Sequence, residues 1–183
     1  MSEIMTHSKK MFDPLHPDAE KIDIEDMAHS LSMLCRANGH FKSFYSVGQH
    51  SINCMKEAVA RGYSRRVQLA CLLHDASEAY LSDVTRPVKE ELPKYKQIEE
   101  PLQALIWSKF LGAPLTEEEN TQVFDIDDAV LAVEFLELMG APLDMVAQPL
   151  VAVPELAFMG FQPCRQEFLR LFRQLTCGQE HIG

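Results

Sequence analysis

The chain has 183 residues, enough for one domain with a full apolar core, and 46% of them are hydrophobic while 24% are charged. Its formal net charge of −10 argues against a nucleic-acid partner, because duplex binding depends on basic patches that offset phosphate charge. No apolar run is long enough for a membrane span or a signal peptide, so we expect a cytoplasmic protein with no membrane partner.

The order of elements along the chain predicts an all-α protein, folded as a compact helical bundle. An arm over residues 1–21 lacks helical periodicity, and residues 22–183 are expected to form a single domain. Apolar residues at steps of three and four predict the helices. These are expected at Ile22–Asn38, Val47–Arg61, Arg65–Leu81, Lys94–Leu111 (where Pro101 begins a second segment or kinks the helix), Thr116–Met139 and from Pro163 onward.

Two connections separate these helices. Residues 82–93 are expected to form a loop with at most one helical turn, and residues 141–161 carry three prolines and no steady period, which is typical of a long connection. Thr116 and Glu119 have the spacing of a capping box at the start of their helix.

The five cysteines are scattered and include no CxxC pair, so the sequence suggests neither a zinc ribbon nor a redox dithiol. Cys35, Cys54 and Cys71 lie inside apolar helical patterns. We therefore expect them to be small buried side chains in the core.

The dipeptide His74-Asp75 is unusual because the residues before it, LACLL, are strongly apolar. An imidazole and a carboxylate buried side by side are unfavourable unless they are paired, and a divalent metal ion would pair them. His50 and Asp127 would add a second imidazole and a second carboxylate from two other helices. Helical bundles build metal sites in their cores in this way.

The order H…HD…D and the context of each member resemble the HD-domain phosphohydrolases. The segments LCRANGHFKSFYSVGQHS and LLHDASEAYLSDVTRPVK, with the run from Asp127 to Glu134, are similar to the small bacterial and phage branch that contains the 5′-deoxynucleotidases. This resemblance covers residues from about Ile22 to Leu175. It implies that His50, His74, Asp75 and Asp127 bind one divalent transition metal ion: Mn, Co, Ni, Fe or Zn.

The resemblance also implies roles for other residues. Glu78 matches the acidic residue beside the attacking water, and its position four residues after His74 is one turn along the same face of the expected helix. Asp83 matches a residue near the sugar hydroxyl and the scissile phosphate, and Arg36 matches an arginine that contacts phosphate. Lys89 matches a basic residue after the proline pair.

Two assignments have alternatives. His40 is a candidate for substrate binding, and capping of the preceding helix is its alternative role. In the run Asp125-Ile126-Asp127-Asp128, the spacing to Glu134 favours Asp127 as the fourth ligand, with Asp128 as the alternative.

The resulting hypothesis is a metal-dependent phosphohydrolase that removes the 5′-phosphate of deoxynucleoside 5′-monophosphates. The alternatives are a deoxynucleoside triphosphate triphosphohydrolase, for example one directed at dATP, and a non-catalytic nucleotide-binding regulator on the same scaffold. The resemblance further implies a homo-oligomer.

Overall fold

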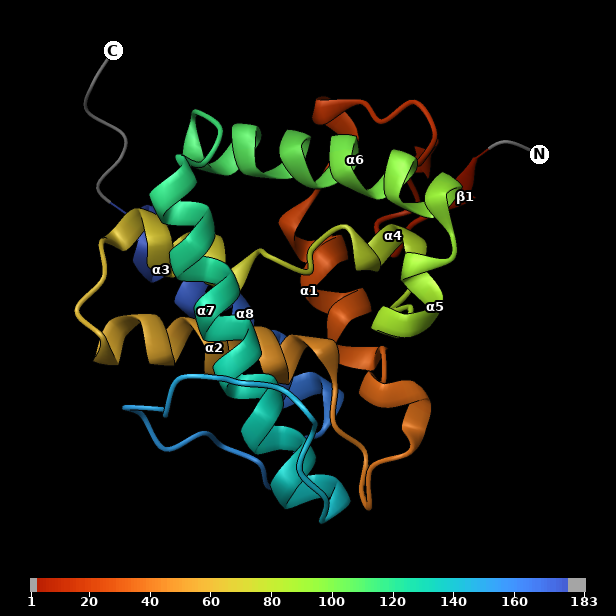
Figure 1. The fold of residues 1–183 in the computed structure, drawn as a ribbon. Coiled ribbons are helices and arrows are strands. Elements are labelled where there is room, and N and C mark those ends of the chain that lie inside the picture. The colour runs from red at the N-terminus through yellow and green to blue at the C-terminus, as the bar shows by residue number, and fades with distance from the viewer. Residues whose placement is uncertain (1–2, 178–183) are drawn as a thin grey trace.

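The computed structural model describes residues 3–177 and contains eight α-helices within that range (Figure 1). The expected all-α fold is therefore confirmed. The helices are α1 (Ile24–Met33), α2 (Val47–Ala60), α3 (Arg65–Leu72), α4 (Glu78–Leu81), α5 (Arg86–Glu90), α6 (Pro93–Leu111), α7 (Glu117–Glu134) and α8 (Phe161–Thr176). Among the described residues, no helix is both long and apolar enough to cross a membrane.

Short polar side chains begin several of these helices. Asp23, Ser46 and Ser64 each accept a hydrogen bond from a backbone N–H in the first turn of α1, α2 and α3 respectively, which satisfies a donor that the helix leaves free. At the start of α7, Thr116 and Glu119 form the capping box that their spacing predicted.

Helix α2 is central to the bundle and packs against α1, α3, α7 and α8. In Figure 1, α6 runs along one side of the bundle and continues into α7, which crosses α2. The core lies between these helices, and its fully buried side chains include Met27, Leu31, Ile52, Leu69, Leu72, Ile106, Ile126 and Phe168.

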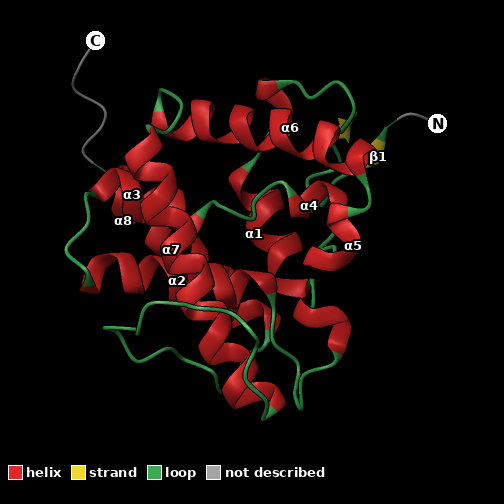
Figure 2. Cartoon of the chain, in the orientation of Figure 1, coloured by secondary structure: helices red, strands yellow, loops and turns green. Residues whose placement is uncertain are grey.

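The arm at the N-terminus packs onto this body. Its strands β1 (Ile4–Met5) and β2 (Met11–Phe12) pair antiparallel, and a 3₁₀-helix, η1 (Ala19–Lys21), leads into α1 (Figure 2). Phe12 is fully buried and stacks on Tyr80, with ring centroids 4.2 Å apart. Ser8 donates its N–H and its O–H to the carboxylate of Asp26 at 2.6 and 2.8 Å. The arm thus adds to the core although it lacks a helical pattern.

Several predicted boundaries are wrong. The expected helix Ile22–Asn38 ends at Met33, and the residues after it form a short 3₁₀-helix, η2 (Arg36–Gly39). Pro101 lies inside α6 and does not begin a second segment, and α8 begins at Phe161, two residues before Pro163. The predicted end at Met139 is confirmed: α7 continues from Glu134 as a π-helix, η3 (Phe135–Met139), which ends at Gly140. Residues 82–93 contain α5, in agreement with the one turn allowed there.

The largest error concerns the helix expected at Arg65–Leu81. Helix α3 ends at Leu72, residues 73–77 form a hydrogen-bonded turn, and α4 begins at Glu78. A side chain from another helix stabilises the break: Gln103 of α6 donates to the carbonyl of Leu73 at 2.8 Å and accepts from the N–H of Ser77 at 3.0 Å. These bonds satisfy one backbone group on each side of the break.

The long connection after η3 crosses the surface of α2 and has no regular secondary structure, as predicted (cyan to blue in Figure 1). Buried polar side chains of α2 hold it. Gln49 donates to the carbonyls of Glu155 and Ala157, and Asn53 bonds both backbone groups of Glu155. We call residues 141–160 the strap.

Candidate metal centre

His50 lies in the first turn of α2 and is fully buried. Its Nδ1 is 2.7 Å from Oε1 of Glu134, and the hydroxyl of Tyr45 donates to the same oxygen at 2.7 Å. A carboxylate accepts hydrogen bonds, so Nδ1 carries a ring proton. Nε2 lies 3.0 Å from Oδ1 of Asp127 and has a lone pair for a metal ion when the ring is neutral. Such an outer hydrogen bond is the usual way in which a protein orients a metal-binding imidazole.

His74 is held in the same way in the turn between α3 and α4. Its Nδ1 donates to the carbonyl of Cys71 at 2.7 Å, which directs Nε2 toward His50. The two Nε2 atoms are 3.2 Å apart. Because the turn interrupts the helix, Glu78 does not lie one helical turn after His74. That geometric argument for Glu78 is wrong.

Asp127 of α7 adds a carboxylate to the two imidazoles. Its Oδ1 lies 3.0 Å from Nε2 of His50 and 3.7 Å from Nε2 of His74. The neighbouring Asp128 points elsewhere and accepts a hydrogen bond from Arg86 at 3.0 Å. Of the two aspartates left open by the sequence, Asp127 is therefore the one beside the histidines.

Asp75 lies at the edge of this group. Its Oδ2 is 3.3 Å from Nε2 of His74 and 3.9 Å from Nε2 of His50, and it accepts a hydrogen bond from Arg36 at 3.1 Å. The side chains of Asp75 and Asp127 retain 20% and 17% of their exposure, so this side of the cluster is open to solvent.

One member was not expected from the sequence. Cys54, on α2, contributes its sulfur to a group with His50, His74 and Asp127, in which the ligand atoms all lie within 4.8 Å of one another. The structure thus contains a set of nitrogen, sulfur and oxygen donors that can hold a metal ion. Cys54 and Cys71 are buried, as predicted, whereas Cys35 is exposed.

Comparison with known proteins gives relatives but no described activity. No protein-family model matches the chain. The chain is 38% identical over 138 residues to the uncharacterized protein YfdR of Escherichia coli (strain K12), which covers 75% of this chain and 73% of YfdR. The chain belongs to the YfdR family. An uncharacterized protein of Rhodobacter capsulatus is 39% identical over 113 residues, 58% of this chain and 57% of that protein.

Ionic interactions set the charge state of the carboxylates in this YfdR-family cluster. Burial by itself raises the pKa of Asp75, but His74 and Arg36 outweigh burial and hold that pKa well below its usual value. For Asp127, burial likewise opposes ionisation, and hydrogen bonds from His50 and His74 lower the pKa well below its usual value. Both carboxylates are therefore ionised and suited to bind a cation.

The pKa of Glu78 is shifted in the opposite direction to those of Asp75 and Asp127. Glu78 begins α4 and is only 4% exposed, and its Oε2 has no hydrogen-bond partner within residues 3–177. Burial, followed by the charges of Asp75 and Asp83, raises its pKa well above the usual value. Lys89 lies 3.5 Å from the other oxygen of Glu78 and donates to Glu99 at 2.7 Å.

The two remaining predicted site residues are Asp83, which follows a strained residue, and His40, which lies at the surface. Asp83 is half-buried and comes directly after Ser82, whose φ of +80° and ψ of 153° form a conformation that is usual only for glycine. His40 is exposed at the end of η2, where its backbone N–H donates to Ala37. Among the described residues, its side chain makes no hydrogen bond to the cluster.

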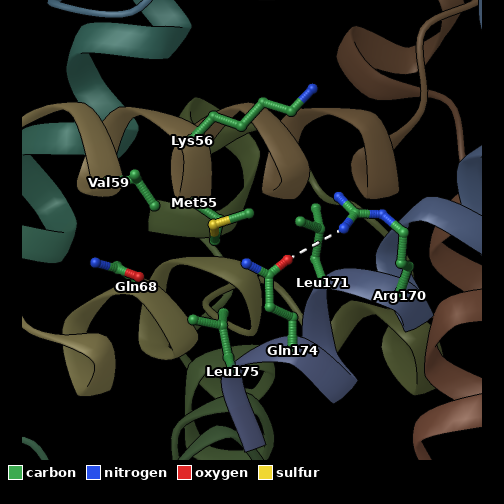
Figure 3. Close-up of a pocket in the computed structure, with 8 residues that line it drawn as sticks. All are labelled: Met55, Lys56, Val59, Gln68, Arg170, Leu171, Gln174 and Leu175. Carbon is green, nitrogen blue, oxygen red and sulfur yellow. Dashed lines mark hydrogen bonds between the residues drawn. The ribbon is translucent and has the colours of Figure 1, made fainter. Parts of the chain in front are cut away.

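The protein also has a surface groove of about 280 Å³ between α2, α3 and α8 (Figure 3). Met55, Gln68 and Leu175 line it, and Arg170 donates to Gln174 at 3.1 Å along one wall. The groove shares no lining residue with the metal cluster. It is therefore a separate feature of the surface.

Proposed function

We propose that this YfdR-family chain is a divalent-metal-dependent phosphohydrolase of the HD type that hydrolyses the 5′-phosphate ester of deoxynucleoside 5′-monophosphates. One observation carries the proposal. Two imidazoles and a carboxylate from three separate segments converge within 4.8 Å in a partly buried site, and the outer nitrogen of each imidazole is already hydrogen-bonded. Such outer hydrogen bonds accompany metal-binding histidines.

His50, His74, Asp75 and Asp127 would hold the metal ion. Mixed nitrogen and oxygen donors suit Mn, Fe, Co, Ni or Zn. When bound, such an ion lowers the pKa of a coordinated water and neutralises charge on a phosphate oxygen. The open side at Asp75 and Asp127 is the side from which substrate would approach.

Glu78 is suited to orient the attacking water and, in its ionised form, to accept the proton of that water. Its Oε2 is free of protein hydrogen bonds among the described residues, while Lys89 holds the opposite oxygen. A side chain fixed at one oxygen and free at the other can bond a water in a defined direction.

Arg36 and Lys89 would supply positive charge for the phosphate. Both are largely buried among carboxylates: Arg36 pairs with Asp75 at 3.1 Å and with Glu134 at 3.4 Å, and its side chain is only 11% exposed. The planar guanidinium can bond two phosphate oxygens, which a lysine does less well. In this proposal, Asp83 lies near the sugar and the scissile phosphate.

The test uses metal-stripped protein refilled with Mn, Fe, Co, Ni or Zn and supplied with deoxy- and ribonucleoside mono- and triphosphates. Asp127→Ala and its neighbour Asp128→Ala form a matched pair, because only Asp127 lies with the histidines. We expect inorganic phosphate from deoxymonophosphates, with turnover reduced at least about a hundredfold in Asp127→Ala and retained in Asp128→Ala.

Other outcomes have distinct meanings. Release of triphosphate from a deoxynucleoside triphosphate would retain the metal chemistry and replace the substrate. Absence of turnover with every metal, together with tight nucleotide binding, would contradict the enzymatic proposal in favour of a regulatory protein.

A further inference from the structure

Cys54 follows His50 by four residues on α2, so both side chains lie on the same face of the helix, one turn apart. Cys54 is 1% exposed. Its sulfur is 3.4 Å from Nε2 of His50 and 4.0 Å from Nδ1. The sulfur therefore lies nearer the nitrogen that faces His74 and Asp127 than the nitrogen that bonds Glu134.

These separations agree with coordination of one ion. Zinc binds sulfur at about 2.3 Å and imidazole nitrogen at about 2.1 Å, so two such ligands at a tetrahedral angle lie about 3.6 Å apart. The observed distance between sulfur and Nε2 is 3.4 Å, and the sulfur is within 4.8 Å of the donors of His74 and Asp127.

The other buried cysteines have different surroundings. Cys71 is also fully buried beside the site, but it contributes its backbone carbonyl, which accepts from His74, and its sulfur is not in the donor group. The sulfur of Cys164 lies 3.4 Å from the hydroxyl of Ser46. Burial in this region therefore does not by itself bring a thiol to the metal site.

We propose that the sulfur of Cys54 is a ligand of the metal ion and makes the centre selective for zinc or cobalt over manganese and magnesium. The inference rests on the proposed metal centre and narrows its list of metals. Thiolate is a soft ligand that favours zinc, whereas carboxylate and water favour magnesium and manganese. The thiol proton passes to solvent as the ion binds.

Cobalt spectroscopy on the full chain tests this inference without relying on activity. Cobalt(II) bound to thiolate has a sulfur-to-metal charge-transfer band in the near ultraviolet, which nitrogen and oxygen ligands do not produce. We expect this band in the wild-type protein and in Cys71→Ala, and its loss in Cys54→Ala. Zinc affinity should fall at least about tenfold in Cys54→Ala, and manganese affinity should stay near that of the wild type.

A second variant covers the case in which Cys54→Ala does not fold. It keeps Cys54 and replaces Cys35, Cys71, Cys164 and Cys177, so a band that remains in it must come from Cys54. Stoichiometric cobalt binding to the wild type without a charge-transfer band would overturn the role of Cys54 and leave the metal centre intact. Failure of the folded wild type to bind cobalt or zinc would overturn the metal centre itself.

Discussion

A single residue, Glu134, fixes the orientation of the His50 ring. It is fully buried, and its carboxylate faces Nδ1 of His50, the hydroxyl of Tyr45 and Nε of Arg36. In Glu134→Gln, an amide NH₂ group would replace one carboxylate oxygen. One of the three groups that now face an acceptor would then face a donor. We predict a loss of metal affinity of about 10- to 100-fold, measured by competition with a metal-binding dye. The exposed Glu137 is the matched control, and equal affinities in Glu134→Gln and Glu137→Gln would contradict the assignment.

Ser82 stores backbone strain next to Asp83. Its N–H donates to Glu78 at 2.8 Å and its carbonyl accepts from Tyr95 at 2.8 Å, and these bonds hold it at φ +80°. Glycine adopts this conformation without a Cβ penalty, so Ser82→Gly should raise the free energy of unfolding by about 1 kcal/mol. Ser82→Val should lower it. Equilibrium urea denaturation measures both, and a glycine variant less stable than the wild type would refute the strain argument.

Part of the site could be inferred residue by residue from the sequence. The dipeptide His74-Asp75 is notable because charged groups follow an apolar run, and Asp127 lies in a local aspartate cluster. The parts played by Cys54 and Glu134 could not be read in this way. Glu134 meets His50 across 84 residues of chain, and a cysteine in an apolar helix is ordinarily a core residue.

The break between helices α3 and α4 depends on Gln103 of α6. Replacing Gln103 by leucine would leave the N–H of Ser77 buried without a partner and would remove one of the two hydrogen bonds to the carbonyl of Leu73, which also accepts from the N–H of Ala76 at 3.1 Å. We predict that Gln103→Leu lowers the free energy of unfolding by about 2–4 kcal/mol and also weakens metal binding, because His74 and Asp75 lie in this turn. Urea denaturation of Gln103→Leu beside Gln122→Leu, whose side chain makes a longer bond on the surface of α7, isolates the effect. Equal stability of the two variants would show that the turn forms without Gln103.

Most helices could be predicted from apolar periodicity, and the break in the third could not. The run VQLACLLHDASEAYL has a continuous helical pattern, and the group that interrupts it comes from Gln103, 26 residues after Ser77. The end of the first helix at Met33 was missed for a related reason. Backbone pairing between Cys35 and Ser46 competes with the helix there, and such pairing depends on tertiary structure.

Glu57 attaches the strap to α2. It is 1% exposed and accepts hydrogen bonds from the N–H groups of Val151 and Ala152 and from Arg61. Burial alone raises the pKa of Glu57, but the bonds from Ala152, Arg61 and Val151 outweigh it and lower the pKa from 4.5. A lowered pKa in the folded state contributes stability above the unfolded pKa, and this contribution is lost as the pH falls through the folded pKa.

Glu57→Gln should therefore be less stable than the wild type by about 1–3 kcal/mol at pH 7. The difference should shrink as the pH falls below about 4.5. Unfolding free energies of the two proteins across this range measure the effect. A difference that is independent of pH would mean that the charge of Glu57 does not hold the strap.

The surface of the strap bears on the assembly of the whole molecule. Val146, Val153 and Phe158 are 101%, 94% and 67% exposed, and the bonds from α2 to the strap backbone limit its freedom to turn them inward. Exposed apolar surface of this kind is typical of an interaction site. We predict that two copies of the chain associate through it.

Sedimentation velocity over a range of protein concentrations measures this association. The double variant Val153→Lys with Phe158→Lys should dissociate, while Val88→Lys, which adds charge to an exposed valine on α5, should not. A wild-type chain that stays monomeric at every concentration would contradict the expected homo-oligomer.

The all-α fold class could be predicted from the sequence because it depends on composition and periodicity. The packing of the N-terminal arm could not be predicted in this way. Phe12 enters the core through a two-stranded hairpin whose strands have only two residues each, too short to produce an alternating pattern. Its burial depends on the tertiary contact with Tyr80, which the sequence pattern does not show.

We propose that the partly buried cluster of His50, His74 and Asp127 binds one divalent ion and that this ion is required for hydrolysis of a deoxynucleotide phosphate ester. The most direct measurement titrates metal-stripped protein with each metal and records bound metal and phosphate release in the same samples. We predict that phosphate release rises with bound metal and levels off at one ion per chain. Full occupancy at one ion per chain with no release from any nucleotide, or release that is independent of bound metal, would contradict the account.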